Sequence, residues 1–115
     1  MFVAVRANVT GHMAGAYALK NGYALYHEGT APLFRGAVAP NHAGQSVTFQ
    51  WQQNSGKGWQ PYLSQAQGLD SNSRIAVFLS SGAVKGPAYR VRIVWPGGSG
   101  SAASAAPWSY FKVTS

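Results

Sequence analysis

Two stretches near the C-terminus decide the fold: YRVRIVW at residues 89–95 and WSYFKV at residues 108–113. Their residues alternate in type, which is the period of a strand with one face in a core and the other in solvent. Only Pro, Gly, Ser and Ala occur in the connection at residues 96–107, and this composition predicts a long loop. We therefore expect the two stretches to be neighbouring antiparallel strands.

Strand patterns also recur through the rest of the chain, with turn residues between them. We expect strands at residues 2–10, 16–27 (bent at Asn21-Gly22), 32–39, 45–53, 59–63 and 74–80. Residues 11–15, 54–58, 65–72 and 82–87 are expected to be turns or loops. Because proline cannot donate to a strand ladder, Pro61 places its strand at the edge of a sheet.

Helix patterns are nearly absent, so the chain is expected to be all-β. Seven to eight strands in one domain at residues 1–115 predict a two-sheet antiparallel β-sandwich. A five-stranded oligonucleotide-binding barrel stays open as an alternative if two of the expected strands merge.

The acidic residues argue against catalysis. Glu28 and Asp70 are the only carboxylates, against nine Lys and Arg, and the net charge is +7. A glycosidase pair would need both of them, and hard cations prefer sites with several carboxylates. The chain has no cysteine, and its histidines lack metal-ligand spacing, so we expect polar turn residues at His12, His27 and His42. We expect no enzyme, no cofactor and no metal.

The basic residues are scattered rather than clustered, so nucleic acid is not the expected partner. No stretch approaches the length of a transmembrane segment, and residues 1–6 do not have the pattern of a signal peptide. A strand pattern begins directly after Met1, from which we expect a piece excised from a larger protein.

The outward-facing side chains of the two C-terminal strands form the candidate ligand-binding site. Strand parity places Tyr89, Val91, Ile93, Phe111 and Val113 in the core. The same parity turns five side chains outward: Arg90, Arg92, Trp108, Tyr110 and Lys112. Gln50 and Gln52 join this face if the strand at 45–53 is the next neighbour of the strand at 89–95.

Two interpretations of this outer face are open. Contacts between arginine and aromatic rings contribute about 0.5 to 1 kcal/mol each when exposed, so they can simply stiffen the sheet. Alternatively, Trp and Tyr stack sugar rings while Arg and Gln hydrogen-bond to hydroxyl or acidic groups. Trp59, which opens the strand after a hairpin, is expected to cap the edge of the core.

A set of short motifs resembles the immunoglobulin-like or fibronectin-like β-sandwich modules of secreted bacterial proteins, those of actinobacteria above all. The motifs are Gly36-x-Val38-x-Pro40, Gly44-x-x-Val47, Trp59, Tyr89-Arg90-Val91-Arg92 and Ser109-Tyr110-Phe111-Lys112-Val113. The resemblance covers about residues 33–114, and it lacks the immunoglobulin cysteine pair.

The resemblance implies a non-catalytic accessory or binding module of a larger exported protein, located outside the cell or at its surface. Its implied partners are neighbouring domains of the same chain or a polysaccharide polymer of the cell surface. A carbohydrate-binding module that uses the outer Arg, Trp and Tyr face is one alternative. An oligonucleotide-binding barrel is the second.

Overall fold

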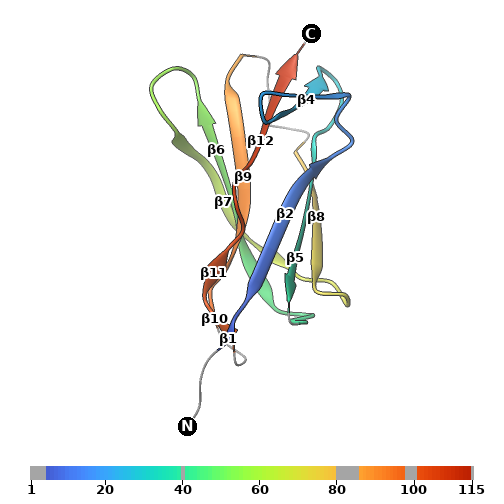
Figure 1. Ribbon diagram of the computed structural model, residues 1–115, viewed down its shortest axis with the longest axis vertical. Helices are drawn as coiled ribbons and strands as arrows, with labels where there is room; N and C mark the ends of the chain where they lie inside the picture. The colour runs from blue at the N-terminus through green and yellow to red at the C-terminus, as the bar shows by residue number, and fades with distance from the viewer. Residues whose placement is uncertain (1–4, 40, 80–85, 98–100, 115) are drawn as a thin grey trace.

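The computed structural model describes residues 5–39, 41–79, 86–97 and 101–114. Every regular element in these ranges is a strand (Figure 1). The strands are β1 (Val5–Arg6), β2 (Asn8–Ala14), β3 (Ala18–Lys20), β4 (Tyr23–His27), β5 (Leu33–Ala39), β6 (Ser46–Asn54), β7 (Gln60–Gly68), β8 (Arg74–Phe78), β9 (Ala88–Trp95), β10 (Ser101–Ala102), β11 (Ser104–Ala105) and β12 (Ser109–Thr114).

The strands form two main sheets that pack face to face (Figure 1). The larger sheet has the order β3-β4-β12-β9-β6-β7, with β11 paired to β9, and the smaller sheet has the order β2-β5-β8. Most neighbours are antiparallel, although β12 runs parallel to β4 and β1 runs parallel to β10. The predicted β-sandwich is confirmed. A closed barrel is not, because β3 and β7 end the larger sheet without pairing to each other.

The two C-terminal strands are antiparallel neighbours, as predicted, and they lie at the centre of the larger sheet. Strand β12 pairs antiparallel with β9, so that Tyr110 lies opposite Arg90 and Phe111 opposite Tyr89. On its other side β9 pairs antiparallel with β6. All the residues assigned to the core from these strands are buried: Tyr89, Val91, Ile93, Phe111 and Val113.

Aromatic side chains fill the space between the two sheets. Phe34 of β5 packs against Phe49 of β6, with 5.7 Å between the ring centroids. Within the larger sheet, Tyr89 stacks on Phe111 at 5.1 Å. Because burial of a large apolar side chain contributes about 1.5–3 kcal/mol, this cluster is a main source of stability. The sheets approach so closely at Gly36 that a Cβ there would lie 2.8 Å from Ile93 Cδ1.

Two stretches that were expected to be loops contain strands. Strand β7 continues to Gly68, through the first part of the polar loop expected at 65–72. Nearly all of β7 is exposed on both faces, so its sequence lacks the alternation that marks a half-buried strand. The connection at 96–107 contains β10 and β11, and its residue Ala106 is buried. Small side chains are sufficient to form strands here because the backbone itself packs closely. Proline 61 does lie in an edge strand, as predicted.

The N-terminal strand differs from the prediction because Gly11 is not a turn residue. Strand β2 runs through it to Ala14, and a Cβ at Gly11 would lie 2.5 Å from Phe34 Cζ. The glycine therefore makes room for a ring. The bend at Asn21-Gly22 is confirmed, with φ angles of 53° and 82° between β3 and β4. Residues 2–4, Ser80 and the expected turn residues 82–85 lie outside the described residues.

The prediction that the histidines are polar turn residues is only partly right. The backbone carbonyls of His27 and His42 each open a turn and accept from the N–H groups of Thr30 and Gln45 at 3.1 Å. His12 lies in β2 and His27 in β4. His42 is buried, and its ring stacks on Trp95 with 4.1 Å between the centroids. Its backbone N–H donates to Ser73 Oγ at 2.9 Å. Isolated histidines in a strand pattern carry no mark that separates them from turn residues, so the sequence could not reveal these places.

Candidate functional site

All seven candidate residues lie on one face of the larger sheet, the face turned away from the smaller sheet. Two register pairs bring β6 and β9 together there: Gln50 lies opposite Arg92 and Gln52 opposite Arg90. Tyr110 of β12 lies opposite Arg90 on the other side. These polar and aromatic side chains converge because every second residue of three neighbouring strands is buried in the core and the residues between them face outward.

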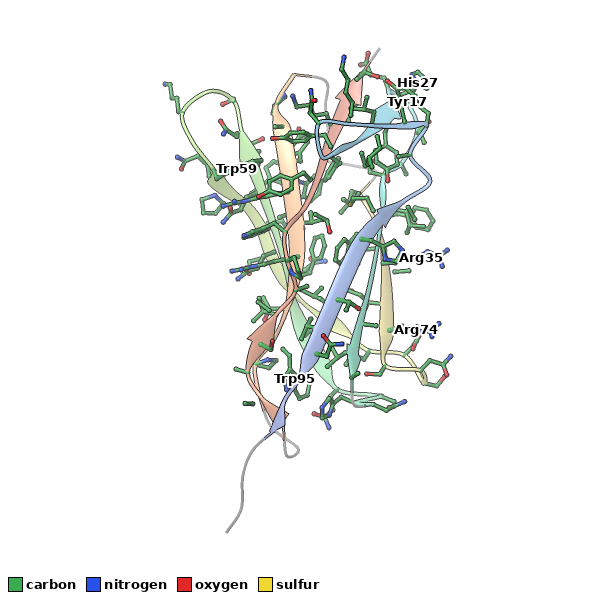
Figure 2. All side chains as sticks on the ribbon, in the orientation of Figure 1. Tyr17, His27, Arg35, Trp59, Arg74 and Trp95 are labelled. Carbon is green, nitrogen blue, oxygen red and sulfur yellow. The ribbon has the colours of Figure 1, made fainter. Side chains whose placement is uncertain are left out.

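Arginine and tryptophan side chains alternate in a chain of contacts on this face. Arg90 Cζ lies 4.5 Å from the ring centroid of Trp59 and 4.2 Å from that of Trp108. Arg92 Cζ lies 4.2 Å from the same Trp108 ring. We call the four residues, Trp59, Arg90, Trp108 and Arg92, the Arg–Trp ladder. Figure 2 shows Trp59 and Arg35 on opposite sides of the molecule, so the ladder face and the smaller sheet's outer face are separate surfaces.

Hydrogen bonds from glutamine hold both guanidinium groups in place. Arg90 Nε donates to Gln52 Oε1 and Arg92 Nε donates to Gln50 Oε1, each at 2.8 Å. A guanidinium group carries five N–H donors in a fixed plane, so the other four of each group are on its two Nη atoms. The glutamines thus fix the orientation of the plane that contacts the rings.

Tyrosine and lysine side chains extend the face beyond the ladder. The Tyr110 ring lies 5.8 Å from Trp59 and 5.5 Å from Tyr23, which β4 contributes. Lys112 Nζ lies 4.6 Å from the centroid of the Tyr23 ring. Lys112 also borders two hollows. One of about 490 Å³ is lined by Tyr17, Lys20, Asn21, Tyr23, Leu25, Lys112 and Thr114. The other, of about 580 Å³, is lined by Asn54, Ser55, Gly56, Gly86, Pro87, Ala88 and Lys112.

This geometry bears on the sugar-stacking interpretation. A sugar stacks on the open face of an aromatic ring, but the Trp108 ring already contacts two guanidinium groups and is partly buried. A ligand stacked there would have to displace an arginine. The ladder is therefore better suited to bracing the sheet than to stacking a sugar ring.

Trp59 was predicted at the edge of the core, which is wrong, and Tyr23 was not predicted to be part of the site. The Trp59 ring lies on the outer face rather than at the core edge, because the β6–β7 register shifts between Trp51 and Gln52. This irregularity reverses which residues at the start of β7 face outward, and the residue types in the sequence do not predict it. Tyr23 reaches the site only through the parallel pairing of β4 with β12, a long-range contact that alternation within each strand does not predict.

The described residues lack two other features that would point to a function. They contain no cluster of three or more His, Cys, Asp or Glu side chains that is placed to hold a metal ion. They also contain no helix with the length and apolar character that would let it cross a membrane.

No protein-family model matches the sequence, and no curated protein matches it.

Proposed function

We propose that this chain is a non-catalytic accessory module of a larger exported bacterial protein, and that its Arg–Trp ladder holds the sandwich rigid. The observation that carries the proposal is the unbroken series of contacts from Trp59 through Arg90 and Trp108 to Arg92. These contacts link β9 to the residues just before β7 and β12, and the glutamine hydrogen bonds add β6. The resemblance to secreted β-sandwich modules supports an extracellular or cell-surface location.

The ladder is large enough to matter for stability. Three ring–cation contacts at about 0.5–1 kcal/mol each give roughly 1.5–3 kcal/mol. Two hydrogen bonds from charged donors add to this. A typical domain is stable by only about 5–15 kcal/mol, so a ladder of this size supplies a substantial part of the total. A rigid unit of this kind suits a spacer between domains or a support for them.

The Trp108→Ala, Tyr110→Ala double variant tests the proposal. We expect its unfolding midpoint in urea to fall, and its retention on insoluble cell-wall polysaccharide to equal that of the wild type while it stays folded. Loss of retention with an unchanged midpoint would overturn the structural role of the face.

Carbohydrate binding by the same face is a second candidate function, and the hollow beside Tyr17 and Tyr23 favours it. Tyr17, Tyr23, Lys20 and Lys112 line this hollow together, so that aromatic rings and hydrogen-bond donors border one space. If the candidate is right, Tyr23→Ala weakens retention on insoluble polysaccharide at least about tenfold. Leu19→Ala, an exposed neighbour outside the hollow, is the matched control and leaves retention unchanged. Equal retention of both variants would exclude this candidate.

A further inference from the structure

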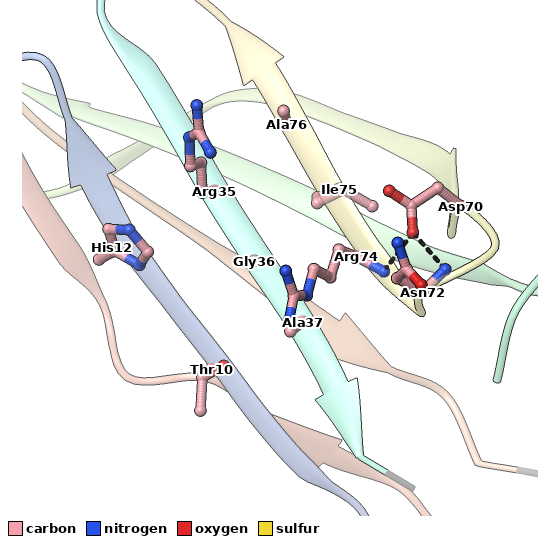
Figure 3. Close-up of a pocket in the computed structure, with 10 residues that line it drawn as sticks. All are labelled: Thr10, His12, Arg35, Gly36, Ala37, Asp70, Asn72, Arg74, Ile75 and Ala76. Atoms are coloured by element: carbon pink, nitrogen blue, oxygen red, sulfur yellow. Dashed lines mark hydrogen bonds between the residues drawn. The ribbon is translucent and has the colours of Figure 1, made fainter. Parts of the chain in front are cut away.

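A basic groove lies on the outer face of the smaller sheet, away from the Arg–Trp ladder (Figure 3). Its volume is about 490 Å³. The lining comes from all three strands of the sheet and from the turn before β8: Thr10, His12, Arg35, Gly36, Ala37, Asp70, Asn72, Arg74, Ile75 and Ala76.

The groove exists because small and large side chains alternate diagonally across the sheet. In one row Arg35 lies between His12 and Ala76, and in the next row Ala37 lies beside Arg74. Alanine therefore occupies the corner beside each arginine and leaves space there. Figure 3 shows the two guanidinium groups on either side of Gly36, with the Arg74 side chain extending from β8 across β5.

The two arginines of the groove are not paired with its one carboxylate, Asp70. Asp70 Oδ1 accepts the backbone N–H groups of Asn72 at 2.8 Å and of Arg74 at 3.0 Å, so this carboxylate closes its own turn. Among the residues that the structure describes, none forms an ion pair with the guanidinium of Arg35 or Arg74. Unlike Arg90 and Arg92, both of these side chains are exposed. With two guanidinium groups and one carboxylate in its lining, the groove carries a net positive charge and is open to solvent.

We propose that this groove binds the carboxylate or sulfate groups of an acidic polysaccharide. A guanidinium group presents paired N–H donors that match a planar carboxylate or two sulfate oxygens. Thr10, Asn72 and His12 supply hydroxyl, amide and imidazole groups for the hydrogen bonds that sugar hydroxyls need. No aromatic ring other than the His12 imidazole lines the groove, whereas sites for single-stranded nucleic acid combine a basic groove with rings on which the bases stack. A net charge of +7 draws polyanions toward the chain.

The experiment is a binding titration with heparin and with polygalacturonate, and with neutral dextran as the uncharged control. The test variant is Arg35→Gln, Arg74→Gln. Its matched control is Lys57→Gln, Lys85→Gln, which removes the same number of positive charges. We expect the groove variant to lose at least about tenfold in affinity for one of the acidic polymers, and the lysine variant to lose about twofold or less. Unfolding in urea should be the same for all three chains.

Three results would overturn the proposal. The first is that the wild type binds neither acidic polymer at moderate salt. The second is that both variants lose the same affinity, because binding would then follow the net charge alone. The third is that single-stranded DNA binds more tightly than either polysaccharide and depends equally on Arg35 and Arg74. These results leave the proposed structural role of the Arg–Trp ladder unaffected, because that role is tested by the stability of variants on the other sheet.

Discussion

Coupling between Arg90 and Trp108 is the most informative prediction for the ladder. The perturbation is a double-mutant cycle of Arg90→Ala, Trp108→Ala and the two changes together. Arg90 Cζ lies 4.2 Å from the Trp108 centroid, and both side chains are half-buried. Ring–cation contacts contribute about 0.5–1 kcal/mol when exposed and about 2 kcal/mol when desolvated. A half-buried pair should therefore show a coupling free energy of about 1 kcal/mol.

The single variants should differ from each other in size. Trp108→Ala removes contacts with two guanidinium groups as well as a partly buried ring, so we expect it to lower the free energy of unfolding by about 2–3 kcal/mol. Arg92 contacts one ring, whereas Arg90 contacts two. Arg92→Ala should therefore cost about 0.5–1 kcal/mol less than Arg90→Ala.

Urea denaturation followed by tryptophan fluorescence and circular dichroism gives the four free energies of the cycle. A second cycle that pairs Trp108→Ala with Arg74→Ala is the control, because Arg74 lies on the opposite sheet. Distant changes add within about 0.3–0.5 kcal/mol, so the control coupling should be near zero. If the Arg90–Trp108 coupling is no larger than that of the control, the ladder contacts do not stabilise the protein and the reasoning is refuted.

Three further predictions concern the core, and each can be measured by denaturation. Gly11→Ala should destabilise by about 1–3 kcal/mol because its Cβ would overlap a ring, whereas Gly68→Ala, with nothing within 4 Å, should be close to neutral. Ser73→Ala should cost about 1–3 kcal/mol because it leaves the buried His42 N–H without its acceptor. Ser73→Gly should cost less, since it relieves the positive φ of 60°. Burial raises the pKa of Tyr26 above its usual value of 10. Its contribution to stability is therefore complete below pH 10 and is lost as the pH rises through the folded-state pKa, and Tyr26→Phe should flatten this alkaline loss.

The sequence predicted the parts of the fold in which each strand has one buried face. In β6, β9 and β12 the alternation is strong, because every second residue must enter the core. That pattern also predicted which side chains face outward, and with them the seven candidate residues of the outer face. The pairing of β9 with β12 was predicted from their succession along the chain, whereas the pairing of β9 with β6 was left open.

The parts that could not be predicted depend on long-range pairing or on backbone irregularity. Strand β4 joins the site through parallel pairing with β12, which the chain forms over a large sequence separation. The register shift after Trp51 moves Trp59 to the outer face. The basic groove is formed by diagonal neighbours from three strands. In the sequence alone, Arg35 and Arg74 are therefore indistinguishable from isolated surface charges.

The most direct test of a structural ladder is the stability of Arg90→Lys compared with that of Arg74→Lys. Both changes keep the positive charge, but only the first removes a planar group that contacts two rings and donates from Nε to Gln52. We predict that Arg90→Lys lowers the free energy of unfolding by about 1 kcal/mol or more, and that Arg74→Lys changes it by less than about 0.5 kcal/mol. Equal values for the two variants would contradict the ladder, because charge alone would then account for the face.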